Sequence, residues 1–235
     1  SISISGYHMQ EAGANQALEL AFTLADGKEY VKTAIAKGLD VDAFAGRLSF
    51  NFNCFGSIFE QVAKFRAGRS LWAKIMKEQY AATQPGSMWL RMIAGGGGGG
   101  LTFEQPEVNI VRGAYYALIA ALGGAQTMAL CCYDEAYTIP TEYAQRISLR
   151  TMQLLLEEMG LADTVDPLGG SWYVETLTNQ MREKMEQTMA EVDAQGGIVK
   201  LVAEGAIQAK VSAQAYRMQR AIEAARQRNA MGIAT

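Results

Sequence analysis

Short segments typical of β-strands alternate along this chain with longer segments of helical periodicity, and this alternation restricts the possible folds more than any other feature. The strand-like segments are residues 2–7, 48–54, 88–94 and 127–133. The helical segments that follow them are residues 15–38, 57–80, 106–122 and 141–159. One strand and one long helix recur about every 40 residues, as in a (β/α)8 barrel. The pattern predicts an α/β fold of four βα units, half of a TIM barrel.

The rest of the sequence has a different character. A turn cluster, Asp166-Pro167-Leu168-Gly169-Gly170, precedes helical segments at residues 175–195, 197–204 and 209–227, whose charges alternate in sign. We therefore expect a half barrel in residues 1–162 and a helical extension in residues 163–235. A half barrel leaves two strand edges unpaired, and the chain begins with Ser1 inside a strand-like segment. We expect it to be part of a larger protein whose N-terminal barrel half is missing here.

The composition argues against several classes of protein. A net charge of −3 over 235 residues gives no reason to expect nucleic-acid binding. No apolar run reaches the roughly 18 residues that a transmembrane helix needs. Three cysteines, two of them adjacent at Cys131 and Cys132, favour a reducing compartment, the cytoplasm.

Candidate functional residues follow the first strand. His8, the only histidine, stands beside Tyr7 and three residues before Glu11. The carboxyl ends of barrel strands carry the chemistry of barrel enzymes, and an imidazole there can bind a substrate carbonyl. A structural histidine at a helix entrance remains the alternative for His8. Glu11 either caps the following helix or contacts a polar cofactor group.

The second strand carries Arg47-Leu48-Ser49-Phe50-Asn51. Ser49 and Asn51 share one face of this strand because side chains alternate with a period of two. The Arg47 guanidinium offers paired donors to a phosphate or carboxylate. A surface arginine with polar residues in a barrel layer is the competing interpretation.

Six glycines, residues 95–100, follow the third strand. They form either a flexible linker or a loop whose backbone closely approaches a flat or bulky ligand. The run lacks the Lys-Ser/Thr of a phosphate-binding P-loop. At the end of the fourth strand, Cys131 and Cys132 point to opposite faces and make a poor metal pair, so we expect no metal site. Asp134 and Glu135 follow them at the end of the strand. For these two carboxylates, capping of the following segment is the alternative to a functional role.

Taken together, a series of motifs resembles the methylmalonyl-CoA mutase family of adenosylcobalamin-dependent acyl-CoA mutases, over residues 2 to roughly 224. The motifs are Tyr7-His8-Met9-Gln10-Glu11-Ala12-Gly13-Ala14, Ala25-Asp26-Gly27, Arg47-Leu48-Ser49-Phe50, Asn109-Ile110-Val111-Arg112, Asp134-Glu135-Ala136 and Asp166-Pro167-Leu168-Gly169-Gly170-Ser171. The resemblance implies the C-terminal half of the acyl-CoA-binding barrel of the large, catalytic subunit. It implies an isomerase that rearranges an acyl-CoA carbon skeleton by radical chemistry.

The resemblance also implies roles for single residues. His8 would hydrogen-bond the substrate thioester carbonyl, with Tyr7 beside it, and Arg47, Leu48 and Ser49 would contact the acyl-CoA. Glu11, Glu135 and Gly95 would lie on the adenosylcobalamin side of the barrel. The family's cobalt-ligand motif, Asp-x-His-x-x-Gly, is absent from the sequence. A further domain or a small subunit would supply it, so the chain alone should be inactive and the enzyme should be an oligomer.

Two departures from the family pattern concern the substrate. Ile93 and Gly95 replace a usual His and Gln, and Cys131 stands where Asn is common. A less polar wall suits another branched or substituted acyl-CoA. Two alternatives remain open at this point: a non-catalytic partner subunit of such a mutase, and an unrelated barrel enzyme that uses His8 with Glu11 or Glu135 as acid and base.

Overall fold

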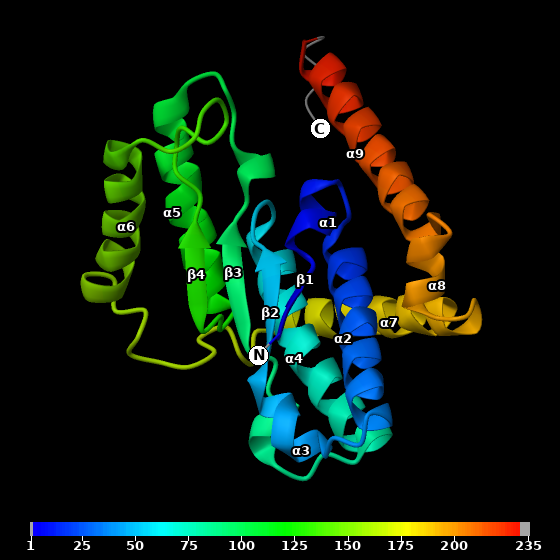
Figure 1. Cartoon of the computed structure of the whole chain (residues 1–235). Helices are drawn as coiled ribbons and strands as arrows, with labels where there is room; N and C mark the ends of the chain where they lie inside the picture. The colour runs from blue at the N-terminus through cyan, green and yellow to red at the C-terminus, as the bar shows by residue number, and fades with distance from the viewer. Residues whose placement is uncertain (1, 231–235) are drawn as a thin grey trace.

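A four-stranded parallel sheet forms the centre of the computed structural model, which describes residues 2–230. The strands are β1 (Ile2–Ser5), β2 (Leu48–Asn53), β3 (Met92–Gly96) and β4 (Thr127–Leu130). They lie side by side in chain order, so all four carboxyl ends meet at one edge, the upper edge in Figure 1. This α/β arrangement is that of half of a (β/α)8 barrel, and the predicted fold class is confirmed.

A long helix follows each strand, as the sequence pattern predicts. These helices are α2 (Gln16–Ala36), α4 (Ile58–Tyr80), α5 (Pro106–Leu122) and α6 (Glu142–Glu157). Local capping explains where three of them begin. The Asn15 side chain accepts a hydrogen bond from the Leu18 amide at 3.0 Å, Pro106 occupies the first turn of α5, and Thr141 accepts one from the Ala144 amide at 3.2 Å.

The predicted strand boundaries need correction at several ends. The third strand begins at Met92 rather than residue 88, because Pro85–Met88 forms a 3-10 turn. The first strand ends at Ser5, because Tyr7–Glu11 forms the short helix α1. The fourth ends at Leu130 rather than residue 133. Val41–Phe44 (α3), Ala45–Arg47 and Gly98–Gly100 are further single turns.

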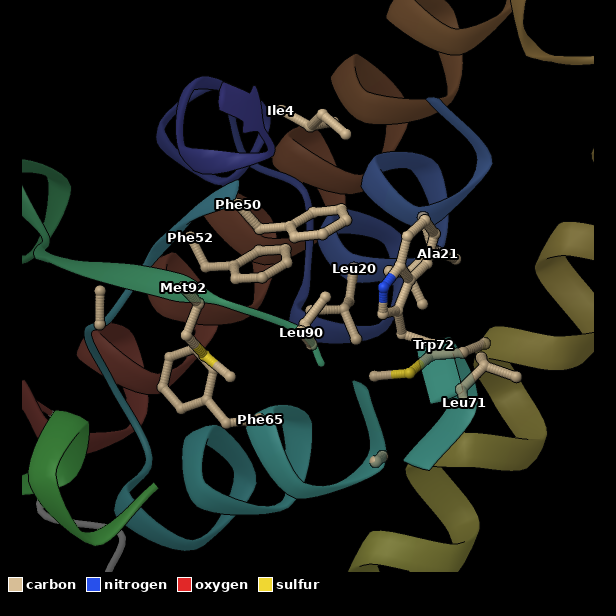
Figure 2. Packing of buried hydrophobic residues seen from close by; sticks show 14 of the residues in the cluster. Ile4, Leu20, Ala21, Phe50, Phe52, Phe65, Leu71, Trp72, Leu90 and Met92 are labelled. Atoms are coloured by element: carbon tan, nitrogen blue, oxygen red, sulfur yellow. The ribbon is translucent and has the colours of Figure 1, made fainter. Parts of the chain in front are cut away.

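One face of β2 carries the aromatic core. Phe50 and Phe52 are completely buried and their rings stack, with centroids 6.0 Å apart (Figure 2). Trp72 from α4 meets Phe50 edge-on at 4.9 Å. Such aromatic contacts contribute beyond the burial of their apolar area, so they add to the packing of β2 against α4.

The opposite face of the sheet is polar near β1 and β2. The strand register places Ser3 beside Ser49, Ser5 beside Asn51, and Asn51 beside Ile93. These residues alternate with the buried Leu48, Phe50 and Phe52, as the period of two requires. In a closed barrel this face lines the interior.

Three helices follow the half barrel: α7 (Trp172–Ala194), α8 (Ile198–Ala203) and α9 (Ala206–Ala230). Helix α7 runs across α2 and α4, and its Met181, Met185 and Met189 belong to the same core (Figure 1). Helix α9 extends away from the sheet. The division at residues 162 and 163 stays a prediction, and Ser1 and residues 231–235 of the two expected regions lie outside the described residues.

Candidate functional site

Helix α1 presents three of the predicted site residues at the carboxyl edge of the sheet. His8 and Glu11 are exposed, and Tyr7 is half-buried. The Gly6 amide donates to the Asn51 carbonyl at 2.9 Å, which ties the start of α1 to β2. Gly6 has to be glycine, because a Cβ there would overlap the Thr23 hydroxyl of α2. The sequence predicted a turn here, whereas the structure forms a five-residue helix.

Tyr7 reaches across the ends of β3 and β4. Its hydroxyl lies 3.7 Å from the Cys131 sulfur, and a Cβ on Gly95 would overlap its ring. Burial, followed by the neighbouring Cys131, raises the pKa of Tyr7 well above its usual range. Burial and the nearby Glu135 raise the pKa of Cys131 to about 12. Both groups are therefore neutral at physiological pH and suited to hydrogen bonding or packing rather than to nucleophilic attack.

A cleft of about 530 Å³ opens beside this pair. Its wall is formed by residues of α1, of the three strands β2, β3 and β4, of the loop after β4, and of α6. They include Tyr7, Asn51, Ile93, Gly95, Cys131 and Glu135. The structure thus brings three of the predicted site residues, Tyr7, Gly95 and Glu135, around one open space, together with the departure positions Ile93 and Cys131. His8 is not among the residues of this wall.

The glycine run is an ordered turn that other side chains of this chain cover. A Cβ on Gly97 would overlap the Phe55 ring, and one on Gly100 would overlap the Tyr116 hydroxyl. A Cβ on Gly99 would lie 2.9 Å from Glu11 Oε2. Neighbouring side chains thus occupy the space of a Cβ at five of the six glycines, and at Gly98 a Cβ would make only ordinary contacts. Gly99 is exposed at the rim, whereas Gly95 is buried against the Tyr7 ring and lines the cleft.

The two carboxylates after β4 form local hydrogen bonds. Glu135 Oε1 accepts from the Cys132 amide at 2.7 Å, and the Glu135 side chain is exposed. Asp134 is buried and accepts from the amide and hydroxyl of Thr141 at 3.0 and 2.9 Å. Asp134 therefore acts as a structural cap before α6, while Glu135 also faces the cleft.

Arg47, Leu48 and Ser49 lie at the opposite end of the sheet. Arg47 is exposed in the turn before β2, Leu48 is buried, and the Ser49 hydroxyl donates to the Ile2 carbonyl at 3.3 Å. At about 3.3 Å per strand residue, Arg47 is roughly 20 Å from the carboxyl end of β2. The structure does not bring these residues together with His8. The predicted site residues form two groups, one at each end of β2.

A buried polar cluster under α1 escaped the sequence analysis. Lys64 of α4 and Glu19 of α2 form an ion pair with a distance of 2.7 Å, and both side chains are completely buried. Burial raises the pKa of Glu19, and the Lys64 ammonium opposes this rise. The sequence did contain a signal for this pair: one lysine and one glutamate stand within the apolar stripes of two helices. Because an unpaired charge is too costly to bury, two such residues indicate a buried ion pair.

No three His, Cys, Asp or Glu side chains within residues 2–230 are grouped as a metal site requires. In the same range, none of the helices combines the length and the hydropathy that a bilayer crossing needs.

Comparison with known proteins identifies similar chains. A family model described as methylmalonyl-CoA mutase matches residues 1–234. Methylmalonyl-CoA mutase from Cereibacter sphaeroides is 49% identical over 223 residues, which cover 95% of this chain and 31% of that protein. The 2-hydroxyisobutanoyl-CoA mutase large subunit from Aquincola tertiaricarbonis is 48% identical, covering 92% of this chain and 38% of that protein. The human mitochondrial methylmalonyl-CoA mutase is 42% identical, with 95% and 30% covered. The chain thus spans about a third of the length of these relatives.

Proposed function

This chain belongs to the methylmalonyl-CoA mutase family, and on that premise we propose that it is part of an isomerase that rearranges the carbon skeleton of an acyl-CoA. The observation that carries the proposal is the position of His8. It is exposed on α1 at the carboxyl edge of the parallel strands, where barrel enzymes do chemistry. The family assignment leaves no support for an unrelated acid–base barrel enzyme. The presence of both His8 and Glu11 argues against a non-catalytic partner subunit.

His8 donates a hydrogen bond to the thioester carbonyl of the substrate in this proposal. An imidazole there stabilises negative charge that develops on the carbonyl oxygen as the acyl group migrates. Tyr7 closes one side of the cleft against Gly95 and Cys131 and helps to exclude water from reactive species.

Arg47, Leu48 and Ser49 bind the distant part of the acyl-CoA. The roughly 20 Å between Arg47 and the carboxyl end of β2 suits a long substrate that lies along the sheet with its thioester near His8. The exposed Arg47 guanidinium can contact a phosphate of the coenzyme A portion.

The rim residues Glu11, Gly95 and Glu135 are proposed to face adenosylcobalamin. The fit rests on the rim itself: Gly98 and Gly99 present no side chains, and the exposed Glu11 carboxylate lies next to them. A flat macrocycle with polar groups at its edge can approach such a surface. When bound, the cofactor supplies the radical chemistry of the rearrangement. The one histidine of the chain lies in α1, so a cobalamin-binding domain or small subunit would supply the cobalt ligand.

The remaining partners follow from the open edges of the sheet. Both β1 and β4 lack a neighbour on one side among the described residues. We infer that strands of the N-terminal barrel half pair with them in an oligomeric enzyme, and that this chain alone is inactive. Three free cysteines are compatible with the proposed cytoplasmic location.

The substrate is proposed to be a less polar or bulkier branched acyl-CoA than methylmalonyl-CoA, because Ile93, Gly95 and Cys131 form an apolar part of the cleft wall. A panel of acyl-CoA thioesters, assayed with the complete enzyme and adenosylcobalamin, tests both levels of the proposal. Isomerisation of at least one thioester supports the mutase function. Methylmalonyl-CoA as the best substrate by far would contradict the substrate proposal alone. Turnover that needs no cobalamin would contradict the mutase function.

A further inference from the structure

Helix α1 has little stability of its own. It contains five residues, its N-cap makes no side-chain hydrogen bond, and glycines stand on both sides at Gly6 and Gly13. Isolated helices of this length do not form in water, so contacts from outside must fix its position. Gln10 is the only buried residue of α1, and it points to the polar cluster beneath the helix.

The three protons of the Lys64 ammonium find three acceptors. They are Asn53 O at 2.6 Å, Glu19 Oε2 at 2.7 Å and Gln10 Oε1 at 3.4 Å. Glu19 Oε1 in turn accepts from the Asn53 amide at 2.7 Å. The cluster thus connects α4, α2 and the last residue of β2 with α1, and every proton of the ammonium has a partner.

Asn53 extends the cluster to the exposed rim. Its side-chain amide donates to Glu11 Oε1 at 2.6 Å, and its side-chain carbonyl accepts from the Cys54 amide at 2.8 Å. Lys64 therefore reaches α1 in two ways: directly through Gln10, and through Asn53 to Glu11. His8 stands in the same short helix, two residues before Gln10 and three before Glu11.

We propose that Lys64, with Glu19 as its counter-charge, is a positioning residue that fixes α1 and thereby the placement of His8 and Glu11. Well-packed apolar side chains of similar volume often stabilise a protein as well as a buried ion pair does, so stability alone does not explain this pair. Directional hydrogen bonds to Gln10 and Asn53 supply what apolar contacts lack, a defined position and rotation of the short helix. The catalytic consequence rests on the proposed mutase function, whereas the anchoring of α1 does not.

The test compares variants of the complete enzyme with two independent measurements. Lys64→Met removes the ammonium, and the double variant Glu19→Gln with Lys64→Met also removes the counter-charge while it keeps an acceptor for the Asn53 amide. Amide hydrogen exchange of the peptide that covers residues 6–14 reports on α1. The kcat and KM for the acyl-CoA report on catalysis. If Lys64→Met does not fold, hydrogen exchange and kcat of the double variant alone test the proposal.

We expect faster exchange in residues 6–14 and a kcat about 10- to 100-fold lower in both variants, because small misplacements of a catalytic group have effects of this size. KM should change little, since Arg47 and Ser49 bind the coenzyme at the other end of β2. Compared with Lys64→Met, the double variant should recover thermal stability but not kcat. If the pair had a purely structural role, kcat would recover together with stability.

Two controls match these changes. Lys74→Met removes a lysine of the same helix that pairs with Glu186 on the surface, and it should leave both measurements unchanged. Met185→Ala destabilises the core away from α1 and should leave kcat per folded enzyme unchanged. Unchanged exchange in residues 6–14 would overturn the anchoring, and unchanged kcat with faster exchange would overturn the catalytic consequence. If the wild-type enzyme isomerises no acyl-CoA, the mutase function fails, and the exchange data still decide the anchoring.

Discussion

Strands β2 and β4 belong to one sheet but have very different surroundings. Four of the six residues of β2 are buried, whereas all four residues of β4 are exposed or half-buried. Helix α6, which follows β4, buries only Ala144 and Ser148 and leaves Leu149 56% exposed. Strand β2 is covered by α2 and by Phe65 and Trp72 of α4, with α7 packed behind these helices. The alternation of apolar and polar residues thus determines which face of a strand is apolar. The neighbouring helices and strands determine whether that face is covered.

The largest expected effect is on turnover, and it concerns His8 in α1, at the carboxyl edge beside the well-covered strand β2. His8→Ala should lower turnover of the complete enzyme by about 10²- to 10⁴-fold, because a positioned imidazole contributes this much to a reaction. Adenosylcobalamin binding, followed by a spectral titration, should stay intact. His8→Gln, which keeps a hydrogen-bond donor, serves as the matched control and should retain more activity. Near-normal turnover of His8→Ala would refute the role of the imidazole.

The difference in coverage can be tested through stability. Phe50→Ala on β2 should lower the free energy of unfolding by about 3–5 kcal/mol, because it opens a cavity in the aromatic core. Leu149→Ala on α6 should change it by only about 0.5 kcal/mol in the isolated chain, since that side chain is largely exposed. Urea unfolding of the 235-residue chain measures both. Equal effects would mean that α6 is covered as well as β2 is.

Close packing around α2 also buries an ionisable group, the carboxyl group of Asp26. Burial raises the pKa of Asp26 to about 6. Between about pH 4 and pH 6 the folded state binds more protons at this group than the unfolded state, so stability decreases as pH rises through that range. Asp26→Asn should therefore stabilise the protein by about 1–3 kcal/mol at pH 7 and have no effect below about pH 4. Thermal unfolding as a function of pH measures this difference.

Asp42 provides the control of opposite sign. Hydrogen bonds from Thr83 and Ser87 lower its pKa to about 2, so its folded-state contribution is present above its unfolded pKa and is lost as pH falls toward 2. Asp42→Asn should destabilise the protein at pH 7. A stability gain for Asp26→Asn that does not depend on pH would show that titration is not its cause.

A small effect is also expected at Cys131, on the open side of the sheet. Cys131→Ala removes only a weak contact with the Tyr7 hydroxyl at 3.7 Å, and we expect a loss of stability below about 1 kcal/mol. Thermal unfolding checks it, with Cys54→Ala as the comparison, because Cys54 is buried beside β2 and should cost more. A larger loss at Cys131 would reverse the ranking of the two sides.

Sequence periodicity predicted the four βα units and the motifs that identify the family, because both depend on local patterns. It missed α1, since a five-residue helix is too short for a helical pattern. It began the third strand too early because Met88, Trp89 and Leu90 are apolar. The separation of Arg47 from His8 could have been inferred, because one precedes a strand and the other follows one.

The aromatic cover of the glycine run and the Lys64–Glu19 pair depend on contacts between segments far apart in the chain. Phe55 lies in the loop after β2, Tyr116 in α5 and Glu11 in α1, and each fills space beside the loop. No local pattern encodes such neighbours, so only the folded arrangement reveals why five of these six positions lack side chains, and nothing in the structure explains the glycine at Gly98.

The turn after α1 contacts the projecting helix α9. Gly13 has a φ of +107°, and a Cβ on it would overlap Ala215 of α9. Bulk at either position would push the two segments apart, and the positive φ would strain any side chain at Gly13, so Gly13 should tolerate no exchange and Ala215 no larger residue. Replacing α9 with a different C-terminal segment would therefore disturb α1, which carries His8, unless the contact between Gly13 and Ala215 is kept.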